Sequence, residues 1–282
     1  MLDYKIAIIL YGHLRTFSRC APSLRKHIRN PLKADLFLHT WNEFDSTTPA
    51  WYSENWKVHN DNTNISACVE KAYNPTGFQI DTPITREEIK NEFLYDQNNK
   101  PRISLMGLYS GMTSLKRAVE LLSKYEKKEK IKYKYIIVTR PDIYFGLSTT
   151  LFFEKNITSL DKSIIGCNAL SVDNFKIGDC LINRKTGFDT AFWGSKEAII
   201  KFSRIVDYFD NIFSVKKTWM KFFHKIGVFW PEVFYELYLN LESIHLQCFD
   251  LDVFVERKKG VEKKSVSFAS KLLQSIFLGQ KK

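Results

Sequence analysis

The sequence lacks the cysteine pattern of a disulfide-stapled domain or of a structural zinc site. Its five cysteines are widely spaced, odd in number and never arranged as Cys-x-x-Cys. Disulfide frameworks and zinc ribbons need paired or closely spaced cysteines. We therefore expect free thiols and a protein of the reducing cytoplasm.

Long apolar runs are missing as well. A membrane-spanning helix needs about 20 consecutive apolar residues, and no segment of the 282-residue sequence approaches that length. The first apolar run, residues 6–11, is too short for the core of a secretory signal peptide. These absences predict a cytoplasmic protein whose contact with the inner face of a membrane is at most peripheral.

Positive charge, by contrast, is in excess. The 42 Lys and Arg residues outnumber the 31 Asp and Glu residues, which gives a formal net charge of +11. Such an excess indicates an anionic partner: a phosphorylated ligand, an acidic membrane surface or nucleic acid. The cations are spread over several turns and the C-terminal tail, and no familiar nucleic-acid recognition signature occurs. We therefore expect no nucleic-acid partner.

Three apolar segments have the composition of buried strands. Residues 5–11 (KIAIILY) and 35–41 (DLFLHTW) are separated by a helix expected over residues 21–28. This order of strand, helix and strand predicts a parallel pair with a right-handed crossover. Residues 135–139 are almost wholly apolar, which suits a central strand covered on both faces.

Apolar periodicity predicts further elements. The clearest helix covers residues 103–125, and a second amphipathic helix covers residues 197–209. Residues 245–255 have the pattern of a last strand, on which Asp250 and Asp252 would share one face. Two carboxylates at that spacing can hold a metal ion, but the hydrophobic alternation is enough to explain them as the polar side of an edge strand.

Charged residues follow the first and third strands directly. The first strand runs into Gly12, His13 and Arg15, and the third runs into Arg140 and Asp142 with a proline between them. The proline ends the strand because it cannot donate to a sheet ladder. Ligands of open α/β sheets bind at the carboxyl ends of the strands, where arginines can hold phosphate oxygens. We therefore expect a binding site for a phosphorylated ligand at this edge.

Some polar residues at the strand ends can have a purely structural role instead. Arg140 and Asp142 can form a salt bridge that caps the strand. His39, at the carboxyl end of the second strand, is by default a hydrogen-bonded structural residue. Arg15 lies on the turn itself, so a ligand contact is the favoured interpretation there.

The C-terminal tail differs in composition from the rest. Residues 258–282 combine many lysines with spaced apolar residues, which is typical of a basic amphipathic helix. Such a helix can lie on an anionic membrane, pack on the protein itself or pack on a second subunit. We therefore divide the chain into a domain at residues 1–257 and a tail at residues 258–282.

A resemblance to a known family rests on five blocks in the order of the chain: residues 7–17, 34–41, 135–145, 189–195 and 231–232. The chain resembles bacterial and large-virus glycosyltransferase-like proteins that are associated with capsule, lipopolysaccharide and other surface glycans. The resemblance spans about residues 5–257 and implies a single Rossmann-like α/β domain of glycosyltransferase-A type, with a mostly parallel central sheet flanked by helices. It also implies a nucleotide-sugar donor and a glycan or glycolipid acceptor.

The resemblance also implies roles for particular residues. In the first turn Tyr11 and Gly12, with His13 and Arg15 beside them, would bind the nucleotide-sugar. The turn from Arg140 to Asp142 stands where such folds have an Asp-x-Asp metal motif. Because arginine replaces the first aspartate, Mn²⁺ or Mg²⁺ has lost one ligand and Asp142 alone remains for it. Arg140 can itself neutralise a diphosphate.

The chemistry of sugar transfer suggests two catalytic carboxylates. Displacing a nucleoside diphosphate from an anomeric carbon with inversion needs a base that takes the proton of the acceptor hydroxyl. Asp189, just before a short apolar strand, is our first candidate and Glu232 the second, although Glu232 can also be a helix-start charge. Two other functions stay open. One is transfer of another phosphorylated group onto a glycan, and the other is non-catalytic binding of anionic membrane or nucleic acid.

Overall fold

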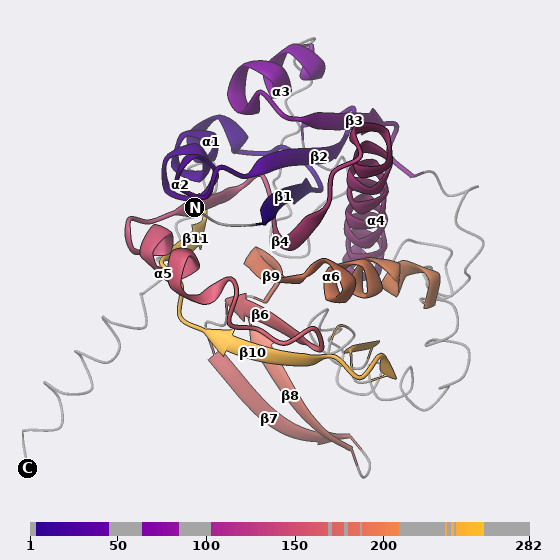
Figure 1. Cartoon of the computed structure of the whole chain (residues 1–282). Helices are drawn as coiled ribbons and strands as arrows, with labels where there is room; N and C mark the ends of the chain where they lie inside the picture. Colours follow the sequence, from indigo (N-terminus) through magenta and orange to yellow (C-terminus); the bar gives the residue numbers. More distant parts are fainter. Residues whose placement is uncertain are drawn as a thin grey trace, which may run out of the picture.

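The predicted α/β fold, a mostly parallel central sheet flanked by helices, is confirmed. The computed structural model describes residues 4–44, 64–84, 103–168, 171–177, 180–186, 188–208, 235, 238–239 and 241–256. Within them a seven-stranded sheet has the order β10-β6-β9-β4-β1-β2-β3, and helices cover both of its faces (Figure 1). Its strands are β1 (Lys5–Tyr11), β2 (Asp35–Trp41), β3 (Gly77–Asp81), β4 (Tyr133–Thr139), β6 (Ile164–Asn168), β9 (Ala191–Ser195) and β10 (His245–Phe249).

Strand direction decides which turns meet at one edge. β1 pairs in parallel with β2 and β4, β2 with β3, and β6 with β10, whereas β9 is antiparallel to β4 and β6. The last residue of β4, Thr139, therefore lies opposite the first residue of β9, Ala191. As a result, the turn before β9 reaches the same edge as the turns after β1 and β4.

The central strands of the sheet are buried on both faces, as their apolar composition predicts. Because successive side chains of a strand alternate between faces, the apolar residues of β1 divide between two cores. On one face α4 (Ile103–Glu129) and α6 (Lys196–Ser203) cover the sheet. On the other lie α1 (Phe17–Leu24), α3 (Ile65–Tyr73) and α5 (Ser148–Asn156).

The first helix begins earlier and ends later than predicted. It starts at Phe17 and continues through a π-helical segment, η1 (Arg25–Arg29), into α2 (Asn30–Leu32). Pro22 therefore lies inside α1 and lacks the N–H that would bond to the preceding turn. The burial of one apolar face of this helix outweighs the lost hydrogen bond. The buried residues are Phe17, Ala21, Leu24 and Ile28.

The predicted last strand, residues 245–255, is wrong as a single element. It forms two strands, β10 and β11 (Val253–Val255), and β11 pairs with β5 (Ile143–Phe145) outside the main sheet. Asp250 and Asp252 lie in the bend between them and share no strand face. Two hydrogen bonds to the backbone of the bend hold it in place. Leu251 N–H donates to the side-chain Oδ1 of Asn168 (3.1 Å), and Gly146 N–H donates to the Asp252 carbonyl (2.7 Å).

Other described parts are peripheral to the main sheet. A hairpin of β7 (Ser171–Ile177) and β8 (Cys180–Thr186) projects from one end (Figure 1). The single turns η3 (Phe188–Thr190) and η4 (Arg204–Tyr208) flank β9 and α6. Glu232 and the tail at 258–282 lie outside the described residues. Among the helices that are described, none is long and apolar enough to cross a membrane.

Candidate functional site

Three turns meet at the carboxyl edge of β1 and β4. They are the turn after β1, the turn after β4, and η3 before β9. Arg140 joins the last two, because its guanidinium contacts both Asp142 and Asp189. Arg15, from the first turn, contacts the same Asp142. The structure therefore brings together residues that are up to 174 positions apart in the sequence, between Arg15 and Asp189.

Arg140 occupies the centre of this group. Its Nε and Nη2 atoms donate to the two oxygens of Asp142 at 2.9 and 3.0 Å, and its Nη1 donates to Asp189 Oδ2. Such a bidentate contact fixes the plane of the guanidinium. Burial lowers the pKa of Arg140, but the carboxylates of Asp142 and Asp189 outweigh it, so the net pKa lies well above the ordinary value. Arg140 is therefore a permanent cation.

Arg15 is held in an unusual backbone conformation. Its φ of 48° lies in the left-handed region, which costs a non-glycine residue roughly 1–2 kcal/mol. The Arg15 N–H donates to the Phe44 carbonyl at 2.7 Å, and this bond helps to hold the turn. The conformation directs the side chain so that Nη1 reaches Asp142 Oδ2 at 3.0 Å. Strain of this kind is concentrated at ligand sites, which supports a binding role for the turn.

The two carboxylates of the site differ in access to solvent. The side chain of Asp142 is 1% exposed, whereas that of Asp189 is 35% exposed. Arg140 and Arg15 are partly accessible, with 16% and 24% of their side chains exposed. An anionic ligand that enters from solvent therefore meets Asp189 and both guanidiniums, while Asp142 stays behind them as a fixed counter-charge.

Gly12 is held by a serine that sequence reasoning missed. The Gly12 N–H donates to Ser114 Oγ on α4 at 2.7 Å. Ser114 is fully buried, and its hydroxyl is also 2.7 Å from His39 Nδ1. Gly12 has a φ of 91°, a conformation that side chains other than hydrogen rarely adopt. Ser114 falls between the stripe positions Met112 and Leu115 of the long helix, so the apolar periodicity of the sequence does not mark it.

His39 is a hydrogen-bonded structural residue, as predicted by default. Its Nε2 lies 2.9 Å from Asp81 Oδ2, and Asp81 also accepts from Arg117 Nη1 at 2.6 Å. Burial lowers the pKa of His39, although Asp81 opposes this. A neutral imidazole donates at one nitrogen and accepts at the other, so Nε2–H donates to Asp81 and Nδ1 accepts from Ser114. This buried network connects the turn after β1 to the end of β3.

Tyr11 and His13 are both uncharged near pH 7. Burial raises the pKa of Tyr11, Asp189 and Asp142 raise it further, and Arg140 opposes them. The Tyr11 hydroxyl therefore keeps its proton and can donate it in a hydrogen bond. Burial lowers the pKa of His13 to about 3, with the Arg15 charge acting in the same direction and Glu43 opposing it. His13 Nδ1 is 3.7 Å from Glu43 Oε1, which is too long for a hydrogen bond.

The surroundings of Asp142 do not fit a divalent metal ion. Both of its oxygens already accept from Arg140, and one also accepts from Arg15. Two guanidinium charges next to the carboxylate would repel Mn²⁺ or Mg²⁺. No group of three or more His, Cys, Asp or Glu residues suited to a metal occurs in the part of the chain that the structure describes. A metal role for Asp142 would require both arginines to move away.

Glu256, directly after β11, contacts the turn after β4 and the beginning of α1, and the sequence gives no sign of these contacts. Glu256 N–H donates to the Asp142 carbonyl at 2.8 Å. Thr16 Oγ1 donates to the Glu256 carbonyl at 2.6 Å, and Arg19 Nη1 donates to Glu256 Oε1 at 3.0 Å. These contacts join the beginning of α1 to the far end of the described chain, so no local pattern could indicate them.

Comparison with known proteins gives structural neighbours and no sequence relatives. Neither a family model nor a curated protein matches the chain. One neighbour is a glycosyltransferase involved in the glycosylation of the major capsid of PBCV-1, with 8% identity, a TM-score of 0.33, and coverage of 87% of this chain and 82% of the neighbour. Another is a nucleoside-diphosphate-sugar pyrophosphorylase from Vibrio cholerae RC9, with 11% identity, a TM-score of 0.41, and coverage of 88% and 94%. Both TM-scores lie below 0.5, so neither likeness establishes an activity.

Proposed function

We propose that the protein is a glycosyltransferase that moves a sugar from a nucleotide-sugar to a glycan acceptor. One observation carries the proposal: Arg140 lies between Asp142 and Asp189 at the carboxyl edge of the sheet, with Arg15 against the same Asp142. This edge is where open α/β sheets bind nucleotides. Departure of a diphosphate requires fixed positive charge, which the two guanidiniums supply. Removal of a proton from the acceptor requires a base, which the solvent-accessible carboxylate of Asp189 supplies.

The arginines act on the departing diphosphate. Breaking the bond between the anomeric carbon and the phosphate oxygen leaves negative charge on the nucleoside diphosphate, which a guanidinium can neutralise through paired N–H donors. Asp142 orients Arg140 and is itself shielded from solvent. The Gly12 turn offers a close approach for phosphate oxygens because glycine has no side chain there, and nothing lies within 4 Å of the position a Cβ would occupy.

Asp189 acts on the acceptor. In the free protein its Oδ2 accepts from Arg140 Nη1. A diphosphate that binds the Arg140 guanidinium in place of Asp189 frees the Asp189 carboxylate. The carboxylate can then remove the proton of the attacking hydroxyl. Donor binding would thus prepare the base. Glu232 remains the second candidate for this role.

The acceptor that we propose is a surface glycan of the capsule or lipopolysaccharide kind. This rests on the sequence blocks that resemble proteins of such pathways. The neighbour that glycosylates a viral capsid is described as a glycosyltransferase, and the neighbour from Vibrio cholerae is described as an enzyme of nucleoside-diphosphate-sugars. Both descriptions agree with a nucleotide-sugar donor.

A binding screen tests the proposal. Thermal unfolding is measured with a panel of nucleoside diphosphates and nucleotide-sugars, each with and without Mn²⁺ or Mg²⁺. We expect one nucleotide to raise the melting temperature, since ligand that binds only the folded state stabilises it by about 2.7 kcal/mol at 100 times its Kd. The Arg140→Lys variant keeps the charge but loses the two-pronged contact, so it should show a smaller shift.

Two results would contradict the proposal. One is stabilisation by DNA or anionic vesicles with none by any nucleotide, which would favour a non-catalytic binder. The other is stabilisation of the Arg140→Lys variant equal to that of the unmodified protein. Product analysis with the stabilising nucleotide-sugar then separates sugar transfer from transfer of another phosphorylated group.

A further inference from the structure

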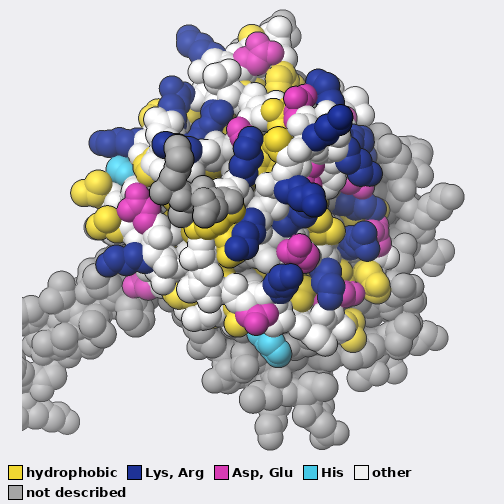
Figure 2. Space-filling model, viewed as in Figure 1, with side chains coloured by type: hydrophobic (Ala, Val, Ile, Leu, Met, Phe, Trp, Pro, Cys, Tyr) yellow, Lys and Arg dark blue, Asp and Glu magenta, His cyan; other side chains and the backbone are white. Residues whose placement is uncertain are grey.

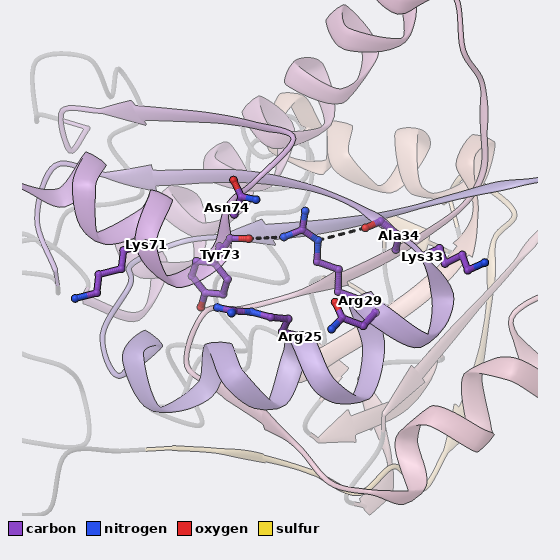
Figure 3. A pocket seen from close by; sticks show the side chains of 8 residues that line it. Arg25, Arg29, Lys33, Ala34, Lys71, Tyr73 and Asn74 are labelled. Atoms are coloured by element: carbon purple, nitrogen blue, oxygen red, sulfur yellow. Dashed lines mark hydrogen bonds between the residues drawn. The ribbon is translucent and has the colours of Figure 1, made fainter.

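A second basic site lies away from the candidate site (Figure 3). A hollow of about 460 Å³ is lined by Arg25, Arg29, Lys33 and Lys71, together with Tyr73 and Asn74. We call it the cationic pocket. Its volume falls within the range of roughly 300–1,000 Å³ that small-molecule sites occupy. Among the described residues that line it there is no Asp or Glu.

The cationic pocket lies at the opposite edge of the sheet from the three turns. Ala34, which also lines it, precedes the first residue of β2, whereas Gly12 follows the last residue of the parallel strand β1. A strand rises by about 3.3 Å per residue, so the seven residues of β2 separate the two edges by roughly 20 Å. A ligand in the pocket is therefore distinct from the proposed donor.

The two arginines are held in place by backbone carbonyls. Arg25 Nη2 donates to the Ala72 carbonyl, and Arg29 Nη1 donates to the Tyr73 carbonyl. Arg29 Nε also donates to the Ala34 carbonyl at 3.4 Å, and Figure 3 shows both Arg29 contacts as dashed lines. Arginines at the last carbonyls of a helix stabilise its end. That role explains these two side chains and uses only part of their five N–H donors each.

Helix capping does not explain the gathering of four cations. Asp35 and Glu70 are the acidic residues nearest to the pocket in the sequence, and neither lines it. Asp35 accepts from Tyr133 Oη at 2.7 Å and lies 4.0 Å from Lys5 Nζ. Burial lowers the pKa of Arg29, Asp35 opposes this, and the charge of Arg25 lowers it further. The charges of Arg25 and Arg29 therefore repel each other, and an anion bound between them would relieve that repulsion.

We propose that the cationic pocket binds the phosphate group of a small soluble molecule. A phosphate carries close to two negative charges and several acceptor oxygens, which suits guanidiniums held in fixed planes together with two mobile ammonium groups. A small molecule fits better than a membrane because the site is a hollow and Arg29 is half-buried at its wall. The proposal does not depend on the glycosyltransferase function.

Site-resolved titration of the full chain with inorganic phosphate tests this. Amide NMR signals of Ala34 and Asn74 should shift with phosphate, and sodium chloride at equal ionic strength should not reproduce the shifts. Lys71→Gln should weaken phosphate binding about fivefold, since one exposed charge contact is lost. Lys201→Gln removes another exposed helical lysine, on the other face of the sheet, and should leave the affinity unchanged.

A second variant avoids the arginines that support α3. Lys33 has a φ of 50°, and Lys33→Asn removes its charge while asparagine tolerates that conformation. Tyr73 is not substituted in this test, because its hydroxyl lies 3.4 Å from the Pro141 carbonyl and a change there would also disturb the candidate site. The proposal is overturned if phosphate shifts only the Gly12 and Asp142 amides, or if neither lysine variant differs from Lys201→Gln. Binding of phosphatidylglycerol vesicles without binding of phosphate would also overturn it.

Discussion

Arg140 holds two carboxylates that belong to different turns. Asp142 lies two residues further along the chain, and Asp189 lies in η3 before the antiparallel strand. The first contact is the salt bridge that a strand-capping interpretation predicts. The second is not local, and it couples the exposed Asp189 to the arginine that we expect to hold the diphosphate. A residue with both contacts can respond to a bound anion by releasing one of them.

Asp189→Asn should abolish sugar transfer and leave donor binding intact. Asparagine cannot accept the proton of the acceptor hydroxyl, and a positioned base contributes about 10²- to 10⁴-fold to the rate. The nucleotide should bind as before, or more tightly, because Arg140 no longer has a charged competitor in Asp189. Turnover and nucleotide affinity are measured on the same preparation.

Glu197→Gln is the matched control for this variant. Glu197 is an exposed carboxylate in the first turn of α6, a few residues after Asp189. Its loss should leave turnover unchanged. Full activity of Asp189→Asn would remove Asp189 from the catalytic role and leave Glu232 as the remaining candidate.

Ser114 ties the longest helix to the turn after β1. Ser114→Ala leaves the Gly12 N–H and His39 Nδ1 without the partner that now satisfies both. A buried polar group without its partner costs about 1–3 kcal/mol, so we expect a loss of that size in the free energy of unfolding. Ser123→Ala is the control, because Ser123 on the same helix bonds only to the Val119 carbonyl of its own preceding turn. Equal denaturation midpoints for the two variants would show that Ser114 does not hold the turn.

Gly166 allows β6 to pass a large aromatic side chain on β9. A Cβ at this position would lie 2.4 Å from the indole of Trp193, its partner in the pairing of the two strands. Trp193 cannot move aside easily, because the rings of Phe152 and Phe153 pack against its indole, with ring centroids 5.3 and 5.1 Å away. We therefore expect Gly166→Ala to lower the free energy of unfolding by about 1–3 kcal/mol, measured by urea denaturation.

Gly107→Ala provides the opposite expectation in the same assay. Gly107 is an exposed residue of α4 with nothing within 4 Å of the Cβ position. Alanine there should stabilise the protein by roughly 0.5–1 kcal/mol, because glycine is a poor helix former. If Gly166→Ala were as stable as Gly107→Ala, the close packing of β6 on Trp193 would be disproved.

Elements whose pattern is local were predictable, and contacts between distant elements were not. β1 and β2 have the expected bounds because both are buried on both faces and end at polar turns. Ser195 is the N-cap of α6, since its Oγ accepts from Ala198 N–H at 3.2 Å, and a serine directly before an amphipathic segment is a local signal for such a cap. Ser114 and Glu256 escaped notice because their partners lie 75 or more positions away, and such pairings depend on the order of strands in the sheet.

The described surface in view carries its positive charge broadly. Lys and Arg side chains are spread over the described surface in view and do not form one continuous stripe (Figure 2). The cations on this face do not follow the single track along which a nucleic-acid groove places them. The cations of the candidate site and of the cationic pocket are instead local features at opposite edges of the sheet.

Stability should fall as the pH falls below about 6.5, because two histidines are buried in the neutral state. Burial lowers the pKa of His13 to about 3 and lowers that of His39 as well. Below the ordinary pKa the unfolded chain binds protons that the folded chain does not, so unfolding becomes easier. Each such group adds a slope of up to about 1.4 kcal/mol per pH unit between the two pKa values. Urea denaturation from pH 8 to pH 4.5 measures that slope.

Replacing one buried histidine separates this effect from the general acid sensitivity of carboxylates. His13→Asn should reduce the slope between pH 6.5 and 4.5, because one group that charges only on unfolding is gone. His245→Gln removes an exposed imidazole at the start of β10 and should leave the slope as it is. If all three proteins share one slope, His13 is not held neutral by burial next to Arg15, and the turn after β1 must be more open to water than its packing indicates.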